Sequence, residues 1–357
     1  MTRSLLRQSW AGGVHCIVPP YMLESIKHRG TPEQRLRAAA TEVQAEQYRD
    51  ERAAAVPGRS LLSAAPSPGE AILQREVYDA DASFDLPGRL VRAEGDPATG
   101  DASADAAYDG AGLTHELFWQ AFDRNSLDGR GMPLVSSVHV GNKMNNAFWD
   151  GQQMAYGDGD GELFTPLALS LSVVGHELTH GVVQYSGGLT YRDQSGALNE
   201  SCADVFGSLV VQRSLGQAAA EANWLVGEEI LGPDVRGDAL RSLKAPGTAY
   251  DDDVLGVDPQ PFHMDDYVVT SADKGGVHIN SGIPNHAFYQ LAMLLGGPAW
   301  EAAGSIWYAA LQEIRNPLAT FSDWADATVE AARTQFGSGS RQVVFTRRSW
   351  KLVGVGV

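Results

Sequence analysis

Cysteine is scarce in this chain: among 357 residues there are two, Cys16 and Cys202. One pair cannot build a disulfide framework, so stability has to come from an apolar core or from bound metal. No apolar run reaches the length that spans a bilayer, and the first residues hold no apolar stretch of signal-peptide length. We therefore expect no membrane anchor, and an ordinary export signal is not visible.

Basic residues are also few. Lysine and arginine number 27 against 44 aspartates and glutamates, which leaves a net charge of −17. Nucleic acids and anionic membranes attract basic surfaces, so this balance argues against both as partners. The composition, 43% hydrophobic and 20% charged, is typical of a globular protein, and the length suffices for two lobes and an appendage.

The first 52 residues look like a separate unit. Thr31–Gln34 has the pattern of a helix start, with a threonine cap, a proline at the first helical position and a glutamine three residues after the cap. Apolar residues then recur at helical spacing, among them Leu36 and Val43, and predict a narrowly amphipathic helix that needs a partner surface. Residues 53–70 are rich in alanine, proline and glycine and predict a linker or a cleavable joint.

Two different patterns follow along the chain. Residues 71–165 mix short alternating runs with Gly/Asp turns, which predicts a strand-rich region with one helix over 112–122. From about Leu167 the apolar residues recur at helical spacing instead. The helices predicted from this spacing cover 167–185, 199–215, 281–295, 299–314 and 321–335.

The segment Ser172–Gly181, SVVGHELTHG, carries two histidines and a glutamate within five positions of an otherwise apolar run. His176 and His180 are four apart, so on a helix both rings project from one face, and Glu177 lies beside them within reach of a metal-bound water. Zinc accepts neutral imidazole nitrogens, and a catalytic zinc site uses three protein ligands and leaves one position for water. The alternative, two core histidines on an apolar helix, is less favoured.

Two carboxylates downstream can complete this site. In GALNESCADVFGSLV, Glu200 comes twenty residues after His180, and Asp204 lies four residues further on the same helix face. One carboxylate can bind the metal, and the other can accept the free N–H of a ligand histidine. The neighbours Val205 and Phe206 indicate a largely buried helix, where unpaired carboxylates cost too much free energy.

The pair HELTH and GALNESCADVFG, at this separation, resembles the motifs of the thermolysin-type neutral metalloproteases, which are gluzincins. Three further segments are similar to that family: 144–161 to its substrate-binding edge strand and the loop after it, 237–243 to its arginine segment, and 273–289 to its second histidine segment. The resemblance covers roughly residues 70–357. It implies a two-lobed α+β fold, with a strand-rich N-lobe, a helical C-lobe and a zinc cleft between them.

The segment His15–Ile26, HCIVPPYMLESI, resembles the short propeptide of the protealysin branch of this family, with its Pro-Pro-aromatic motif. The bland alternative is an ordinary proline-rich turn. With this resemblance the expected units are a propeptide at 1–52, a linker or maturation region at 53–70, a strand-rich lobe at 71–190 that ends in the HELTH helix, and a helical lobe at 191–357.

Cys16 has two possible roles in such a propeptide. Its thiolate could bind zinc and displace the catalytic water. Alternatively Cys16 docks as a small apolar residue, and Pro19, Pro20 and Tyr21 block the cleft by bulk. The second alternative is favoured, because rigid prolines bind at low entropic cost.

The resemblance also implies catalytic roles. The zinc ligands that it implies are His176, His180 and Glu200. Glu177 would act as general base on a zinc-bound water and pass the proton to the leaving amine. Tyr191 and His278 would stabilise the negative charge that develops on the former carbonyl oxygen.

Other residues would support these groups and hold the substrate. Asp204 would orient His176, Asn199 the other ligand histidine and Asp273 the ring of His278. Arg241 would hold a substrate carbonyl past the cut, and Asn146 with the carbonyl of Ala147 would pair with the substrate backbone as an added strand. The pocket for the side chain after the cut maps onto Phe164, Leu167, Val173, Val226 and Leu240. All five are apolar, which implies cleavage on the N-terminal side of large apolar residues.

The chain departs from thermolysin relatives where these bind two calcium ions. The matching positions are Ser172, Val211, Asn223, Leu225 and Glu228, and only the last keeps a carboxylate. Because Ca²⁺ needs several oxygens at once, we expect no double calcium site, although Asp238 matches a ligand of another calcium site. The family resemblance implies secretion, and the lack of a visible signal leaves cytoplasmic retention as the alternative.

These observations predict a zinc endopeptidase made as a self-inhibited precursor. Its partners would be peptide and protein substrates and its own propeptide. A zinc exopeptidase is disfavoured, since no motif for a free amino terminus is visible. A catalytically dead protein that keeps zinc structurally would have lost Glu177, Tyr191 or His278, and all three are present.

Overall fold

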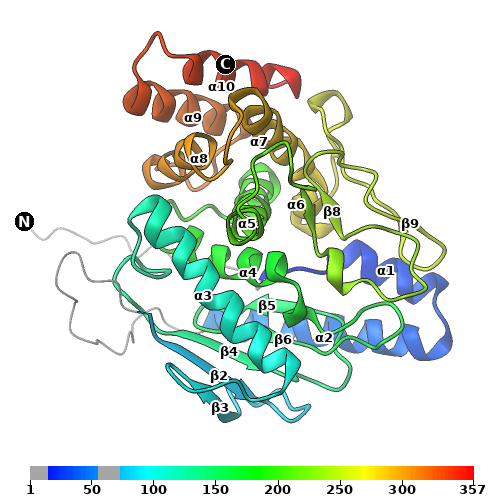
Figure 1. The fold of residues 1–357 in the computed structure, drawn as a ribbon. Coiled ribbons are helices and arrows are strands. Elements are labelled where there is room, and N and C mark those ends of the chain that lie inside the picture. The colour runs from blue at the N-terminus through cyan, green and yellow to red at the C-terminus, as the bar shows by residue number, and fades with distance from the viewer. Residues whose placement is uncertain (1–14, 55–72) are drawn as a thin grey trace, which may run out of the picture.

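The computed structural model describes residues 15–54 and 73–357. The expected linker over 53–70 lies almost wholly outside the described residues. A twisted sheet forms one side of the molecule, and helices cover it and continue into a helical half (Figure 1). Among the described residues, no helix combines the length and apolarity that crossing a membrane would require.

Six strands form the main sheet. They are β1 (His15–Cys16), β2 (Arg75–Asp79), β3 (Arg89–Ala93), β4 (Leu134–Val138), β5 (Ala147–Trp149) and β6 (Met154–Tyr156). Their order in space is β1-β5-β6-β4-β2-β3. The central pairs, β2 with β4 and β4 with β6, are parallel, and the outer pairs are antiparallel. The expected alternating runs thus become β2, β4 and β6, and β1 closes the sheet edge at β5.

Two helices lie between the sheet and the helical half. Helix α3 (Ala102–Phe122) packs on β2 and β4, and α4 (Leu171–Gln184) packs on α3 and β5. Helix α3 begins ten residues before the predicted start, where the side chain of Asp101 accepts a hydrogen bond from the Ala104 N–H at 2.8 Å. Every residue of α4 from Ser172 to Val183 is buried, so its polar side chains must find partners inside the protein.

The helical half confirms the expected helices and adds two. Its members are α5 (Asp193–Ser214), α6 (Asp273–Asn280), α7 (Gly282–Leu295), α8 (Ala302–Glu313), α9 (Phe321–Phe336) and α10 (Arg341–Leu352). Helix α5 begins six residues before the prediction, because Arg192 in front of it gives no capping signal. Helix α6 contains a turn of three residues with positive φ, and α10 exposes much of its length, so neither produced a clear apolar pattern.

Short elements connect these layers. Strand β7 (Leu225–Val226) pairs with β8 (Arg241–Ser242), and β9 (Asp251–Asp252) pairs with β10 (Gly256–Val257). Three 3₁₀ turns lie at η1 (Leu167–Leu169), η2 (Glu228–Ile230) and η3 (Met264–Asp266). The pairing of β8 with β7 places Arg241 in the interior, where it is 1% exposed.

The N-terminal segment forms β1, α1 (Pro20–Arg29) and α2 (Pro32–Ala54). The predicted capping box is confirmed, since the Gln34 N–H donates to the Thr31 hydroxyl and the Thr31 N–H donates to the Gln34 side chain. The predicted apolar face of α2 is wrong: Leu36 is 74% and Val43 53% exposed. Gln34, Ala38 and Thr41 are buried instead.

The reason for this reversal lies in the surface that α2 meets. That surface includes Glu162, which accepts a hydrogen bond from the Gln34 amide at 2.9 Å. The buried face of α2 thus combines this polar contact of Gln34 with Ala38, which belongs to the main apolar cluster together with Met22 and Ile26 of α1. In Figure 1, α1 and α2 are the blue helices, which lie together beside the β9 loop and the sheet.

Candidate active site

Helix α4 presents the two histidines of HELTH on one buried face. His176 donates from Nδ1 to Asp204 at 2.8 Å, and His180 donates from Nδ1 to the Asn199 carbonyl oxygen at 2.9 Å. The Asn199 side-chain NH₂ donates to the Leu189 carbonyl, and this contact orients the Asn199 side-chain oxygen toward His180. Both rings therefore carry their proton on Nδ1, and each Nε2 keeps a lone pair. Burial, and after it the charge of His176, holds the pKa of His180 well below its ordinary range.

Helix α5 brings Glu200 to the same point. Its carboxylate oxygens lie 3.6 Å from the His176 Nε2 and 3.5 Å from the His180 Nε2, and the two Nε2 atoms are 3.1 Å apart. Two lone pairs that face each other beside a buried carboxylate repel one another unless a cation lies between them. The Glu200 Oε2 has no hydrogen-bond donor among the described residues. These three side chains therefore fit a zinc ion, and among the described residues they form one group of ligand atoms within 4.8 Å.

Glu177 lies beside this group. Its Oε2 accepts the Trp149 N–H at 3.0 Å, its Oε1 has no hydrogen-bond partner within the described part of the chain, and the Ile17 N–H of the N-terminal segment faces the carboxylate. Burial, and then the charge of Glu200, raises the pKa of Glu177 well above the ordinary value of a carboxyl. A carboxylate with one oxygen held and the other open can accept a proton from a water molecule in front of it.

Tyr191 and His278 reach the site from the opposite side. The Tyr191 hydroxyl donates to Glu200 and lies 3.1 Å from the His278 Nε2. Asp273 accepts from the His278 Nδ1 at 2.7 Å and from its backbone N–H at 2.9 Å. The His278 Nε2 also lies 3.0 Å from a carbonyl oxygen, that of Cys16, so both ring nitrogens donate and the ring is an imidazolium.

Two observations explain how His278 keeps this form. Burial alone would lower its pKa, but Asp273 and Glu200 outweigh burial and raise it above the ordinary value. The turn before it makes the contact with Asp273 possible, because Gly275 takes a φ of 94° and a Cβ there would meet Asp193 at 2.2 Å.

Asp204 holds two functional side chains: that of His176, as the resemblance implied, and that of Arg241, a contact that the sequence did not reveal. Besides His176 it accepts hydrogen bonds from the Arg241 guanidinium at 2.8–3.1 Å and from the Asn285 amide at 2.9 Å. Burial would raise its pKa, but Arg241 and His176 hold that pKa well below the usual range. Asp204 therefore stays ionised and fixes one ligand ring and one substrate-binding candidate together. Asn285 lies in the segment 273–289, which resembles the second histidine segment of the family, yet nothing in its spacing pointed to Asp204.

The edge strand β5 meets the N-terminal segment of the same chain. The Ile17 N–H donates to the Ala147 carbonyl at 3.2 Å, and the Val18 N–H donates to the Asn146 side chain at 3.1 Å. The Arg241 Nη1 donates to the Ile17 carbonyl at 3.0 Å. Residues 16–18 thus contact the predicted catalytic and binding residues.

The five predicted pocket residues are all buried. Phe164, Leu167, Val173, Val226 and Leu240 are at most 1% exposed and belong to the main apolar cluster. Ile17 belongs to the same cluster and is fully buried. Cys16 packs instead in a smaller cluster with Val140, Met144 and Phe148. The side chain of Cys16, which is 2% exposed, is thus part of the packing between the N-terminal segment and the sheet.

At the positions that match the double calcium site of thermolysin relatives, polar side chains form hydrogen bonds with other groups of the protein. Ser172 accepts from the Gly227 N–H at 2.9 Å and shares a hydrogen bond with Ser170, which in turn donates to Glu229 at 2.6 Å. The Asn223 amide donates to Glu228 at 2.6 Å. The two carboxylates in this region are exposed, so water solvates them.

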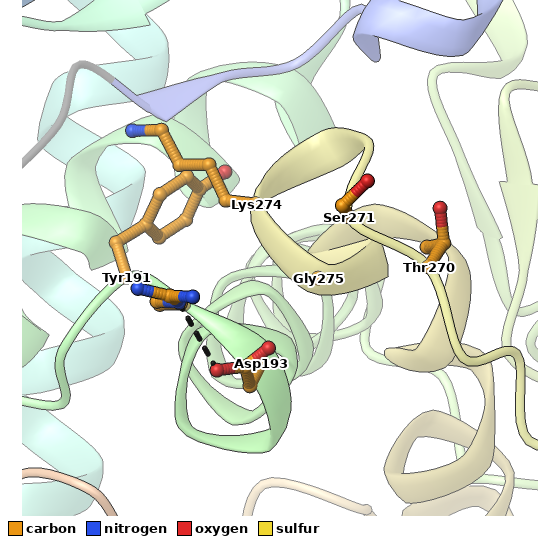
Figure 2. Close-up of a pocket in the computed structure, with 7 residues that line it drawn as sticks. Tyr191, Asp193, Thr270, Ser271, Lys274 and Gly275 are labelled. Carbon is orange, nitrogen blue, oxygen red and sulfur yellow. Dashed lines mark ion pairs between the residues drawn. The ribbon is translucent and has the colours of Figure 1, made fainter.

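A cavity of about 340 Å³ opens beside Tyr191 (Figure 2). Tyr191, Asp193, Ser271 and Lys274 line it, together with Arg192, Thr270 and Gly275. The Lys274 ammonium lies 4.9 Å from the centroid of the Tyr191 ring, a cation–π arrangement. Lys274 lies in the segment 273–289, but the sequence gave it no role, because its neighbour across the cavity, Tyr191, is 83 positions away in sequence.

Comparison with known proteins agrees with this geometry. The thermolysin metallopeptidase catalytic domain matches residues 72–184, and the alpha-helical domain of the same metallopeptidase matches residues 187–355. An extracellular metalloprotease of Pectobacterium carotovorum subsp. carotovorum is 47% identical over 350 residues, which is 96% of each chain. Protease PrtS of a Photorhabdus species is 51% identical over 290 residues, covering 80% of this chain and 77% of its own length.

A solved structure is similar over almost the whole chain. It is the precursor of protealysin, a metalloproteinase from Serratia proteamaculans, with a TM-score of 0.86 and 47% sequence identity. The likeness covers 96% of this chain and 100% of that one, so it includes the N-terminal segment.

Proposed function

This chain belongs to the thermolysin family of metallopeptidases, and from that premise we propose which of its residues carry out zinc-dependent peptide hydrolysis and how its N-terminal segment controls them. The protein is a zinc metalloendopeptidase of this family. The observation that carries the assignment of ligands is the convergence of two imidazole lone pairs and one carboxylate in a buried site. We assign His176, His180 and Glu200 as the zinc ligands.

The protein groups around the zinc have separate tasks. When bound, zinc polarises the substrate carbonyl and makes water more acidic. Glu177 takes the proton of the attacking water through its open oxygen and passes it to the leaving nitrogen. The imidazolium of His278 and the hydroxyl of Tyr191 donate to the oxygen on which negative charge develops. Asp273 keeps His278 protonated and aligned.

Arg241, Asn146 and Ala147 hold the backbone of the substrate. The Arg241 guanidinium is fixed by Asp204 and keeps one N–H group for a carbonyl past the cut. Strand β5 lies at the edge of the sheet formed by the catalytic part, so an extended peptide can add to it as a further strand. The buried apolar pocket that contains Phe164 and Leu240 favours a large apolar side chain directly after the cut.

The N-terminal segment acts as an inhibitor within the same chain. Its support is the set of hydrogen bonds that Cys16, Ile17 and Val18 make with His278, Arg241 and Asn146, since a substrate needs the same partners. Residues 1–52 would thus keep the precursor inactive, and removal through a cut in 53–70 would release activity. The likeness to extracellular proteases supports action outside the cell.

Purified protein provides the test. We expect about one zinc per chain by metal analysis, and cleavage of a quenched fluorescent peptide before Leu or Phe after the N-terminal segment has been removed. N-terminal sequencing before and after incubation would locate the maturation cut. Zinc-loaded mature protein that does not hydrolyse such peptides would contradict the assignment. A form that releases only terminal residues would make the protein an exopeptidase.

A further inference from the structure

The N-terminal segment lies across the catalytic groups in one defined register. On one side of the Cys16–Ile17 peptide bond, the Cys16 carbonyl oxygen accepts from the His278 Nε2 at 3.0 Å. On the other side, the Ile17 N–H donates to the Ala147 carbonyl at 3.2 Å and faces the Glu177 carboxylate. The bond itself therefore lies between the proton acceptor and the oxyanion donors.

The flanking contacts agree with this register. The Arg241 guanidinium holds the carbonyl of Ile17, one residue past that bond. The Asn146 side chain accepts from the Val18 N–H at 3.1 Å, two residues past it, and donates toward the Val18 carbonyl at 3.4 Å. The side chain of Ile17 is fully buried in the apolar cluster that also holds the predicted specificity pocket. Each group thus contacts the segment at the position where the proposed mechanism places it on a substrate.

We propose that the enzyme cuts the Cys16–Ile17 bond of its own N-terminal segment, so that the segment is a substrate of the cleft that it blocks. This inference rests on the proposed function. Water adds across the bond: its oxygen joins the Cys16 carbonyl carbon, and the bond from that carbon to the Ile17 nitrogen breaks. Glu177 carries one of the water's two protons to this nitrogen, and the second proton also ends on it, so the products are a Cys16 carboxylate and an Ile17 ammonium.

The cut does not by itself free the cleft. Residues 17 onward keep their contacts with Arg241 and Asn146, and they stay joined to α1 and α2, which pack against the catalytic part. Helix α1 begins at Pro20, so the chain after the bond turns away from the strand direction and is held there. We therefore expect a cleaved form that is still largely inhibited and that precedes the later removal of residues 17–54.

Mass spectrometry of the full-length, zinc-loaded protein tests the proposal. We expect a peptide of residues 1–16 and a chain that begins at Ile17 to form at a rate that does not change when the protein is diluted tenfold. The bond already lies in the cleft of its own chain, so the reaction is intramolecular. The Glu177→Ala variant, incubated in parallel, should keep the bond intact.

Matched variants at position 17 sharpen the test. Ile17→Asp would bury a charge in an apolar pocket, so we expect cleavage at this bond to slow by about 100-fold or more. Ile17→Leu keeps the apolar character and should be cut at nearly the normal rate. Thermal melting of both variants checks that they fold, and the Met22–Leu23 bond, which lies within α1, serves as an internal control that should stay intact.

The outcomes separate this inference from the proposed function. If the matured protein hydrolyses an external peptide but the Cys16–Ile17 bond of the precursor stays intact, the inference fails and the proposed function stands. A cutting rate that falls in proportion to protein concentration also overturns it, because a second molecule is then the protease. If neither the external peptide nor this bond is cut by zinc-loaded protein, the proposed function fails and takes the inference with it.

Discussion

Two regions of this molecule each place a histidine between two carboxylates. In one region the histidine itself can satisfy both carboxylates, and in the other a metal ion is required. His176 lies between Asp204 and Glu200, with no exposed surface. His139 lies between Asp158 and Asp101, and its side chain is 26% exposed. By residue type alone the two clusters look alike.

The difference lies in the second nitrogen of each ring. The His139 Nε2 reaches Asp101 at 3.1 Å, so a protonated ring satisfies both carboxylates by hydrogen bonds. The His176 Nε2 is 3.6 Å from Glu200 and 3.1 Å from the His180 Nε2, which also carries a lone pair. In the His139 cluster the ring N–H groups satisfy the carboxylate acceptors. In the His176 cluster the facing acceptors have no donor between them, so a cation is needed there. Buried hydrogen-bond acceptors that converge without a donor between them thus indicate a metal site more reliably than the number of carboxylates does.

The largest effect is expected from Glu177→Ala. This variant should keep zinc and fold but lose the general base, so turnover should fall by about 10²–10⁴-fold or more. Metal analysis and peptide hydrolysis of the matured variant measure both properties. Asp158→Asn, which removes a carboxylate from the surface cluster, is the matched control and should leave turnover unchanged. Zinc-loaded Glu177→Ala with near-normal turnover would refute the role of Glu177.

His278→Ala is expected to lower kcat by about 10²–10³-fold with little change in KM, because its hydrogen bond strengthens as charge develops on the oxygen. His139→Ala is the control from the other region and should change neither constant. Steady-state kinetics on one peptide, with both matured proteins, separates the two parameters. An effect confined to KM would make His278 a residue that binds the ground state.

Metal removal should lower the Tm only where a cluster depends on a bound cation, and not where its side chains are paired with one another. A ligand present at about 1,000 times its Kd stabilises the folded state by about 4 kcal/mol. Stripping zinc should therefore lower Tm by roughly 8–16 °C. A calcium chelator too weak to remove zinc should change Tm little, because protein hydrogen bonds already join Ser170, Ser172 and Glu229. A large fall in Tm with the calcium chelator would show that other ligands hold calcium.

The smallest expected effect is the pH-dependent loss of thermal stability when His139 is replaced. Burial would lower its pKa, but Asp158 and Asp101 raise the pKa above the ordinary value, so the folded state binds the proton more tightly than the unfolded chain. This stabilisation is fully present below the unfolded pKa and is lost as pH rises through the folded pKa. His139→Asn should therefore lower Tm by about 1–3 °C at pH 5.5 and by less at pH 9. An equal loss of Tm at both pH values would mean that the charge is not involved.

The sequence predicted the helices that carry the ligands but not the surface that α2 uses. On α4 the spacing of four residues between His176 and His180 is a local property, and the structure shows both rings on one face. On α2 the same reasoning selected Leu36 and Val43, which are exposed, whereas the neighbouring surface covers Gln34, Ala38 and Thr41. Periodicity describes one helix and carries no information about what the helix meets.

The sequence by itself determined the chemistry of the site. HELTH places two imidazoles and a carboxylate close together on one helix, and Glu200 and Asp204 lie four residues apart on the next helix, so residue types and spacing predict a zinc centre with its base. Only the tertiary structure decided that Asp204 holds His176 and Arg241 together, and that Cys16–Ile17 lies over the catalytic groups. The physical reason is distance along the chain: Arg241 and Ile17 are 224 positions apart, and their contact depends on the register in which β1 pairs with β5.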